Sequence, residues 1–171
     1  YEEGEIAVKV SEAVSLIEDQ LPKHWAEEWD NVGLLLGDPD ALIHRIAVAL
    51  DPGPEQLLAA SSGRYDLLIT HHPLLFQPMK KIIVNTPVAQ SIALSLSNGV
   101  AVYAAHTNLD IAEGGVNDVL ADLLDLQELS PLAELGREEL VKLAVYVPEA
   151  QADQVRAAMV QAGAGHIGKY A

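Results

Sequence analysis

The chain has 171 residues, of which half are hydrophobic and one fifth are charged, as is typical of a folded domain. Its 25 acidic and 10 basic residues give a net charge of −15, so we expect no nucleic-acid partner. Cysteine is absent, which excludes disulfides and thiolate zinc sites. We find no apolar run long enough for a membrane helix and no recognisable signal peptide. The expectation is therefore a cytoplasmic protein with no membrane partner.

The first predicted element is a helix that begins at Ser11 and is closed by Pro22. An acidic, aromatic segment follows it and contains Trp25 and Trp29. We interpret the two tryptophans as core anchors, with contact to a ligand as the less favoured alternative. Residues 32–37 then read as a strand. The apolar positions of the helix share one face: Val10, Ala13, Val14, Ile17 and Leu21.

Strands and helices alternate in the next ninety residues. Such alternation with short connections implies parallel strand pairing and right-handed crossovers, so we expect an α/β fold with a mostly parallel sheet and flanking helices. The strand at 46–50 is expected to be buried. The predicted strands are 46–50, 67–70 and 100–104, and the predicted helices are 55–61, 87–97 and 116–124.

A second unit is expected near the C-terminus. Residues 127–139 read as a connector, rich in Leu and Glu, between a lobe at 1–126 and a partial domain at 140–171. Within that partial domain, 140–147 is a predicted strand and 148–162 a predicted helix. A single strand and helix cannot bury both of their faces, so this segment reads as the first half of a ferredoxin-like α+β unit.

Two adjacent histidines end the predicted strand at 67–70. Pro73 forbids helical continuation, so His71 and His72 fall in a loop at the strand end. Imidazole is the commonest side-chain metal ligand. Side chains of adjacent residues on an extended backbone point to opposite sides, so we expect the two rings to diverge and to suit two neighbouring metal ions. Loop histidines without a special role are the alternative interpretation.

A second polar cluster makes it less favoured that the two histidines have no special role. His106 and Asp110 follow the predicted strand at 100–104, and Asp51 follows the strand at 46–50. In parallel sheets the ligand crevice lies beyond the carboxyl ends of the strands, so these residues should meet at one rim. Asp110 supplies a carboxylate ligand, and His106 is the candidate catalytic group that orients water or moves a proton. Asp51 either orients a ligand or, by the favoured reading, forms a turn before Pro52.

With only nitrogen and oxygen ligands, such a centre is compatible with divalent zinc, manganese, iron or cobalt. Dinuclear hydrolytic centres hold their ions about 3.5–4 Å apart and use water as the nucleophile. We read the remaining histidines, His24, His44 and His166, as structural or surface residues.

Taken in order, these motifs resemble the Nif-three-like family of dinuclear-metal proteins, also named type-two homologues of GTP cyclohydrolase I. The matching stretches are 27–37, 69–76 and 106–110, and 163–170 resembles a turn in the PII-like inserted domain of that family. The resemblance implies that His71, His72 and Asp110 are metal ligands, that two ions are held in a complete site, and that the protein assembles as a hexameric ring.

The sequence departs from the family in one respect. The family takes further ligands from a His-x-x-x-Glu pattern in a C-terminal lobe, and no such pattern follows 106–110 here. We therefore expect this chain to be an N-terminal portion of a longer protein.

Three functions are compatible with these features. The favoured one is a metal-dependent hydrolase, GTP cyclohydrolase-like, that acts on a small molecule such as a nucleotide. The others are a non-enzymatic metal-binding ring protein with a regulatory role, and a metal-dependent phosphoesterase.

Overall fold

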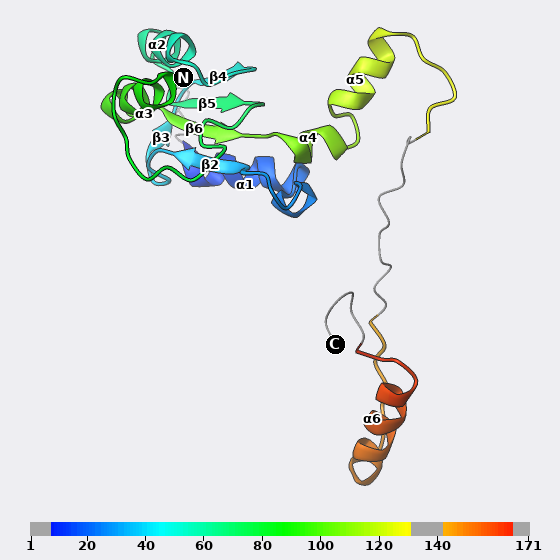
Figure 1. Cartoon of the computed structure of the whole chain (residues 1–171). Coiled ribbons are helices and arrows are strands. Elements are labelled where there is room, and N and C mark those ends of the chain that lie inside the picture. Colours follow the sequence, from blue (N-terminus) through cyan, green and yellow to red (C-terminus); the bar gives the residue numbers. More distant parts are fainter. Residues whose placement is uncertain (1–7, 131–141, 166–171) are drawn as a thin grey trace, which may run out of the picture. The chain divides into compact units, whose positions relative to one another are not determined.

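The structure is a computed structural model that describes residues 8–130 and 142–165 (Figure 1). Contacts within the chain divide it into two compact units, Tyr1–Gln127 and Glu128–Ala171, and each is described by itself. Part of the predicted connector, 131–139, lies outside the described residues.

A four-stranded sheet forms the centre of the first unit, in the order β2-β6-β5-β4. Strands β4 (Ile46–Ala49), β5 (Leu67–Thr70) and β6 (Ala101–Ala104) are parallel, which confirms the mostly parallel α/β fold. Strand β2 (Gly33–Leu36) runs antiparallel to β6, with Gly33 opposite Ala104. The carboxyl ends of the three parallel strands therefore share one edge of the sheet with the start of β2.

Helices cover both faces of this sheet. On one face, α1 (Val10–Gln20) packs its apolar stripe against residues that include Leu67 and Tyr103. On the other face, α2 (Pro54–Ser62) and α3 (Pro87–Asn98) pack against Leu68 and Val102. Because consecutive residues of a strand point to opposite faces, β5 and β6 contribute to both hydrophobic clusters.

Strand β4 is less buried than expected. It pairs only with β5, so it is an edge strand of the sheet. Ala47 and Ala49 pack against the cluster beneath α2 and α3, whereas Val48, on the opposite face, is 79% exposed. The apolar run at 46–50 looked buried because an edge strand and a central strand can carry the same hydrophobic sequence.

Several short elements were not expected from the sequence. Strand β1 (Val8–Lys9) pairs with β3 (Leu42–Ile43), and a 3₁₀ turn, η1 (Lys23–Trp25), follows α1. Helix α4 (Thr107–Ile111) follows β6 and was not predicted, and α5 (Val116–Leu123) comes after it as predicted. Single-turn helices carry too few residues for a periodic hydrophobic pattern, which explains why α4 was missed.

The second unit contains a 3₁₀ turn, η2 (Glu149–Gln151), and helix α6 (Ala152–Gln161), where a helix was predicted. The predicted strand at 140–147 is not formed within 142–147, and its first two residues lie outside the described residues. A strand is stable only when it pairs with another. Across the two described ranges, no helix combines the length and the apolar character needed to cross a membrane.

Candidate metal centre

The histidine pair lies just beyond the end of β5, where the chain bends. The hydroxyl of Thr70 donates a hydrogen bond to the carbonyl of His72 at 2.8 Å and holds this bend. As a result, the rings of His71 and His72 do not diverge, and their centroids are 5.1 Å apart. The expected splay was wrong because residues beyond the strand end do not keep the alternation of extended backbone.

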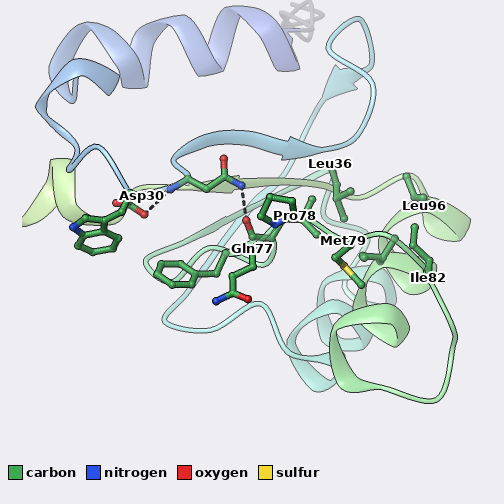
Figure 2. A pocket seen from close by; sticks show the side chains of 12 residues that line it. Asp30, Leu36, Gln77, Pro78, Met79, Ile82 and Leu96 are labelled. Atoms are coloured by element: carbon green, nitrogen blue, oxygen red, sulfur yellow. Dashed lines mark hydrogen bonds between the residues drawn. The ribbon is translucent and has the colours of Figure 1, made fainter.

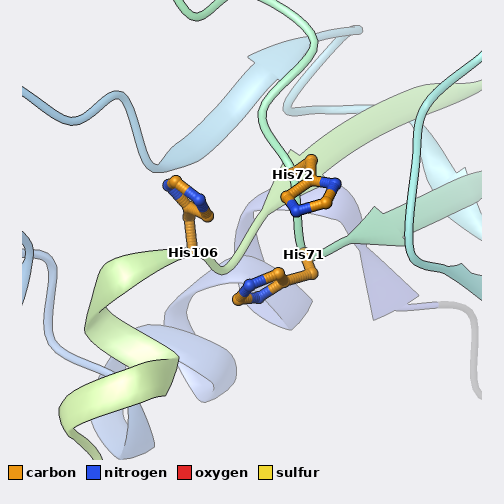
Figure 3. A group of neighbouring side chains, drawn as sticks. All are labelled: His71, His72 and His106. Atoms are coloured by element: carbon orange, nitrogen blue, oxygen red, sulfur yellow. The ribbon is translucent and has the colours of Figure 1, made fainter. Parts of the chain in front are cut away.

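His106 reaches the same place from the end of β6, at the start of α4. Its backbone N–H donates to Asn108 Oδ1 at 3.0 Å, and the amide nitrogen of the buried Asn108 donates to the Leu21 carbonyl at 3.0 Å. The His106 ring lies 5.0 Å from that of His71 and 5.8 Å from that of His72. One ring nitrogen of each histidine lies within 4.8 Å of the others (Figure 3).

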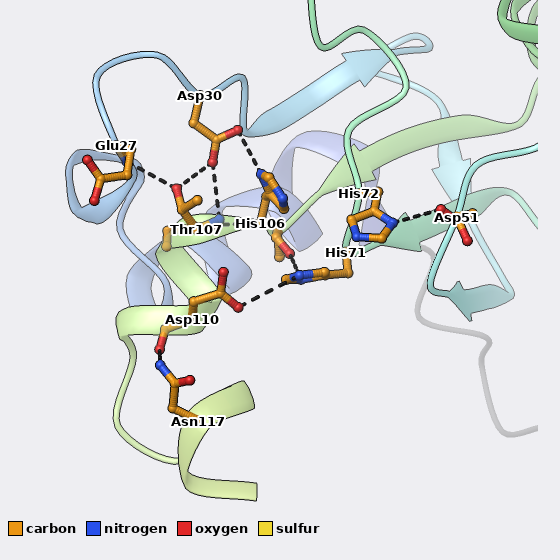
Figure 4. Close-up of polar contacts among 11 residues, drawn as sticks. Glu27, Asp30, Asp51, His71, His72, His106, Thr107, Asp110 and Asn117 are labelled. Carbon is orange, nitrogen blue, oxygen red and sulfur yellow. Dashed lines mark hydrogen bonds and ion pairs between the residues drawn. The ribbon is translucent and has the colours of Figure 1, made fainter. Parts of the chain in front are cut away.

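Each of the three rings is held at Nδ1 by an oxygen atom of the protein (Figure 4). The oxygen that contacts His71 belongs to a backbone carbonyl, which can only accept, so Nδ1 of His71 carries a proton. The oxygens that contact the other two rings belong to carboxylates, which favour the same tautomer. Nε2 of each neutral ring then carries the lone pair that a metal ligand needs. The contacts are His71 to the Ala105 carbonyl at 3.0 Å, His72 to Asp51 at 2.7 Å and His106 to Asp30 at 2.9 Å.

Asp30 is the most completely enclosed carboxylate of the site, since its side chain has no exposed surface. Its Oδ2 accepts bonds from the Thr107 backbone N–H at 3.1 Å and from the Thr107 hydroxyl, and its Oδ1 accepts from the Asn31 N–H at 2.7 Å and from His106. Burial raises the pKa of Asp30, but these hydrogen bonds outweigh burial and bring the pKa below its usual value.

The role of Asp30 was missed in the sequence, where it appeared only as part of the stretch 27–37. Its position directly before a strand that runs antiparallel to β6 brings it to the same edge as His106. Only the strand order reveals this proximity, because the two residues are 76 positions apart in the sequence.

The third predicted metal ligand, Asp110, lies one turn into α4 and faces His71 (Figure 4). Its Oδ1 is 3.7 Å from His71 Nε2, and its carbonyl accepts a bond from Asn117 Nδ2 at 2.8 Å. With Nδ1 of His71 protonated, the neutral ring would turn a lone pair toward a carboxylate. This arrangement is favourable when a cation or a proton lies between the two atoms.

The structure therefore brings His71, His72, His106 and Asp110 together at the predicted rim, with Asp110 reaching it through His71. Asp51 hydrogen-bonds His72, so the less favoured reading, that it orients a ligand, agrees with the geometry. The other histidines lie elsewhere, as expected where the structure describes them: His24 is exposed beside Trp25, and His44 lies 3.6 Å from Asp66. His166 lies outside the described residues.

The donor set fits a divalent transition metal. Three imidazoles and a nearby carboxylate match the preferences of zinc, iron, manganese and cobalt, and each ring is oriented by a hydrogen bond at its other nitrogen. The side chains of His71 and His106 are only 19% and 16% exposed, which protects such a centre from solvent on one side. The cluster could thus bind a metal ion.

Trp29 differs from its prediction as a core anchor. Its side chain is 59% exposed, and its ring makes edge contacts with His106 at 6.3 Å and with Phe76 at 5.8 Å between centroids. An exposed tryptophan beside a histidine cluster is available to a ligand, which was the less favoured alternative.

Comparison with curated proteins finds relatives named GTP cyclohydrolase 1 type 2 homolog. The Bacillus subtilis protein is 44% identical over 164 residues, which cover 96% of this chain and 44% of that protein. The Mycobacterium tuberculosis protein is 35% identical over 166 residues, which cover 96% of this chain and 43% of that protein. The chain thus spans less than half the length of these relatives.

Comparison with solved structures also finds similar proteins. A Bacillus cereus protein related to NIF3 matches with a TM-score of 0.71 and 37% identity, over 96% of this chain and 45% of that chain. Reduced HcgD from Methanocaldococcus jannaschii matches with a TM-score of 0.69 and 37% identity, over 75% of this chain and 52% of that chain. The family Duf34/NIF3 (NGG1p interacting factor 3) matches residues 8–171. The predicted resemblance is confirmed, and the chain belongs to the Duf34/NIF3 family.

Proposed function

We propose that this chain contributes the histidine-rich half of a metal-dependent hydrolase centre that acts on a small molecule. The observation that carries the proposal is the convergence of three imidazoles whose Nδ1 atoms are all engaged by protein oxygens. Histidines with only a structural role would not need to bring their ring nitrogens close together. The names of the curated relatives, GTP cyclohydrolase 1 type 2 homolog, support a nucleotide as the substrate.

In this proposal His71, His72 and Asp110 hold the metal. A divalent metal held there would supply Lewis acidity to the hydrolytic reaction. Asp51 and the Ala105 carbonyl keep the His72 and His71 rings turned toward the centre.

His106 has a separate task in the proposed reaction. Asp30 fixes the proton on His106 Nδ1, so Nε2 is the atom that accepts a proton from the attacking water and returns it to the leaving group. The enclosed Asp30 carboxylate also stabilises the imidazolium formed in between, as it lies 2.9 Å from Nδ1.

A centre with two ions needs more ligands than this chain offers among its described residues. We infer that further ligands come from a part of the full-length protein beyond this chain, which corresponds to less than half of its relatives. Assembly as a hexameric ring in the cytoplasm belongs to the same proposal.

The first test is a titration with Co²⁺, followed by its visible absorption and by metal analysis of the dialysed protein. We expect His71→Ala and His72→Ala to lower Co²⁺ affinity at least tenfold. His44→Ala is the matched control, because His44 is an exposed histidine with its own carboxylate partner outside the cluster. Equal Co²⁺ binding by His71→Ala and His44→Ala would show that the cluster is not a metal site.

The second test is metal-dependent GTP turnover by the full-length protein. The proposal expects turnover that is removed by chelation and restored by metal. His71→Ala should abolish it, while circular dichroism shows a retained fold. A full-length protein that binds metal at these residues but hydrolyses neither GTP nor phosphate esters would contradict the hydrolase and leave a metal-binding ring protein.

A further inference from the structure

A cavity of about 580 Å³ opens beside the histidine cluster and is not used by the proposed chemistry (Figure 2). Its volume falls in the range of small-molecule sites. Segments distant in sequence build it: the turn before β2, the chain that follows the histidine pair, and the outer part of α3.

Aromatic side chains form the end of the cavity nearest the histidines. Trp29 and Phe76 line it, and their rings meet edge to face with centroids 5.8 Å apart. Each of these rings also makes an edge contact with His106, at 6.3 Å. A molecule that lies against Trp29 and Phe76 is therefore next to the proposed metal centre.

The rest of the wall is mostly aliphatic and open to solvent. Met79, Ile82 and Leu96 are 40%, 59% and 59% exposed, although large apolar side chains usually avoid water. Exposed apolar groups that line a concave site gain most when a ligand with a flat apolar body covers them. Methionine adds a polarisable sulfur that packs well against aromatic rings.

The polar groups of the cavity that keep free hydrogen-bonding atoms are neutral amides. Asn31 donates one amide N–H to the Leu75 carbonyl and keeps its Oδ1 without a partner among the described residues, and the same is true of the whole Gln77 amide. Such amides pair with the donor and acceptor edge of a nitrogen heterocycle, which a plain alkyl chain lacks. The Asp30 carboxylate is already engaged on both oxygens.

Charge also restricts the occupant. No lysine or arginine is among the described residues that line the cavity, and the whole chain carries a net charge of −15. An anionic group inside the cavity would therefore be repelled. A cationic group would find its one carboxylate, Asp30, without exposed surface.

We propose that this cavity binds the flat, uncharged heteroaromatic ring of a ligand whose donor atom reaches the histidine cluster. The inference rests on the proposed function and deepens it, because it assigns the class of group that the substrate presents to this chain. Ring stacking against Trp29 and Phe76, together with hydrogen bonds between the ring and the Asn31 and Gln77 amides, selects the ring.

The test compares imidazole with benzimidazole, which share a donor nitrogen and differ by one fused benzene ring. The chain has two methionines, Met79 in the cavity and Met159 on α6 in the second unit, so methyl-¹³C labelling gives a reporter and an internal control. At a pH where both probes are neutral, we expect benzimidazole to shift the Met79 methyl signal saturably. The concentration required should be at least tenfold lower than for imidazole, and Met159 should not respond.

Matched variants test the place of binding. Leu96→Glu puts a carboxylate in the cavity, and Leu16→Glu puts one on α1, at a leucine that is similarly exposed at 67%. The first should weaken benzimidazole binding at least tenfold, and the second should leave it unchanged. Equal responses to the two probes, equal movement of the two methyl signals, or equal effects of the two variants would overturn the proposal.

Repeating the titration with Zn²⁺ separates this inference from the proposed function. If both hold, Zn²⁺ tightens benzimidazole binding, and His71→Ala removes this gain but keeps the metal-free binding. Metal-free binding without any Zn²⁺ uptake would contradict the metal centre and support the ring specificity of the cavity. Zn²⁺ uptake at the histidines with no response of Met79 to benzimidazole would contradict the cavity proposal alone.

Discussion

Two histidine–aspartate pairs flank the candidate metal centre, and their surroundings differ sharply. In the first, His106 and Asp30 are 16% and 0% exposed, and Asp30 is also bonded to Thr107. In the second, His72 and Asp51 are 46% and 60% exposed, and no other group among the described residues holds Asp51 in place. The hydrogen bonds are nearly equal in length, at 2.9 and 2.7 Å.

Hydrogen-bond length alone therefore does not predict what a histidine–aspartate pair contributes to the site. Exposed ion pairs are weakened by water and by the entropy of two free side chains, whereas an enclosed pair with all acceptors filled resists rearrangement. We therefore expect the Asp30 pair to fix geometry and stability, and the Asp51 pair to make only a modest contribution to ligand orientation.

The largest effect is expected from Asp30→Ala. The change leaves His106 Nδ1 and the Thr107 N–H without their acceptor inside the protein. Removing one member of a buried, hydrogen-bonded group costs about 3 kcal/mol of unfolding free energy. Because Asp30 orients His106, the proposed proton-transfer group, its loss should also lower metal-dependent turnover of the full-length protein by about 10–100-fold. Urea denaturation and turnover assays measure the two effects.

Asp30→Asn is the control for shape. Its amide cannot accept from both His106 and the Thr107 N–H, so one donor must face another whichever way the amide turns. We expect a stability loss smaller than that of Asp30→Ala and a clear loss of metal-dependent turnover. A variant as stable and as active as the parent would refute the role given to this carboxylate.

Asp51→Ala is the matching change in the exposed pair. Because both side chains are open to water, we expect unfolding free energy to fall by less than about 1 kcal/mol. Metal affinity should fall by less than about tenfold, since water can replace the lost acceptor at His72 Nδ1. Urea denaturation and Co²⁺ titration measure these two effects. Equal losses of unfolding free energy in Asp51→Ala and Asp30→Ala would show that enclosure is not the deciding factor.

A third histidine–aspartate pair, His44 and Asp66, lies outside the site and should make stability depend on pH. Asp66 accepts the backbone N–H groups of His44 and Arg45 at 2.7 and 2.9 Å and so ties the β3–β4 turn to the start of β5. Burial raises the pKa of Asp66, but these hydrogen bonds outweigh it and hold the pKa below its usual value. Asp66→Ala should cost about 1–2 kcal/mol near neutral pH.

The sign of the pH effect follows from the lowered pKa. The contribution of the Asp66 charge is fully present above its unfolded pKa of about 3.9 and is lost as pH falls through the lower folded pKa. The difference in melting temperature between the parent and Asp66→Ala should therefore be constant near neutrality and shrink below about pH 4. A constant difference down to the acid limit would rule out the charge of Asp66 as the cause.

Local patterns were sufficient to predict much of this fold. The strands at β4, β5 and β6 and the helices α1, α2 and α3 were found from apolar periodicity and from the proline and glycine residues at their ends. The positions of His71, His72, His106 and Asp110 at one rim also followed, because parallel strands bring their carboxyl ends together.

What could not be predicted depends on tertiary neighbours. Strand β2 runs antiparallel to β6, and this direction brings Asp30 next to His106. The bend beyond β5 turned the two adjacent histidines toward one point, through a hydroxyl–carbonyl bond that no hydrophobic pattern indicates. Trp29 was predicted to be a core anchor, yet its surroundings leave it exposed beside the cavity.

The smallest effect on unfolding free energy is expected from Tyr103→Phe. This variant tests whether a buried polar group stabilises the fold when it has no hydrogen-bond partner. Tyr103 on β6 is as fully enclosed as Asp30, but its hydroxyl has no hydrogen-bond partner among the described residues. Burial, helped by the negative charge of Glu18, raises the pKa of Tyr103 to about 12. Removing an unsatisfied buried hydroxyl should change unfolding free energy by less than about 1 kcal/mol and in the stabilising direction.

Tyr146→Phe serves as the control, since Tyr146 is 98% exposed and should be neutral. Absorbance titration should show a tyrosine that ionises late in the parent and is missing in Tyr103→Phe. If Tyr103→Phe instead destabilised the chain by as much as Asp30→Ala, the hydroxyl would have to be bonded in solution, and the number of partners would no longer distinguish these two buried groups. If the variants rank as expected, hydrogen bonds to the carboxylate oxygens stabilise this rim, and burial only strengthens their contribution.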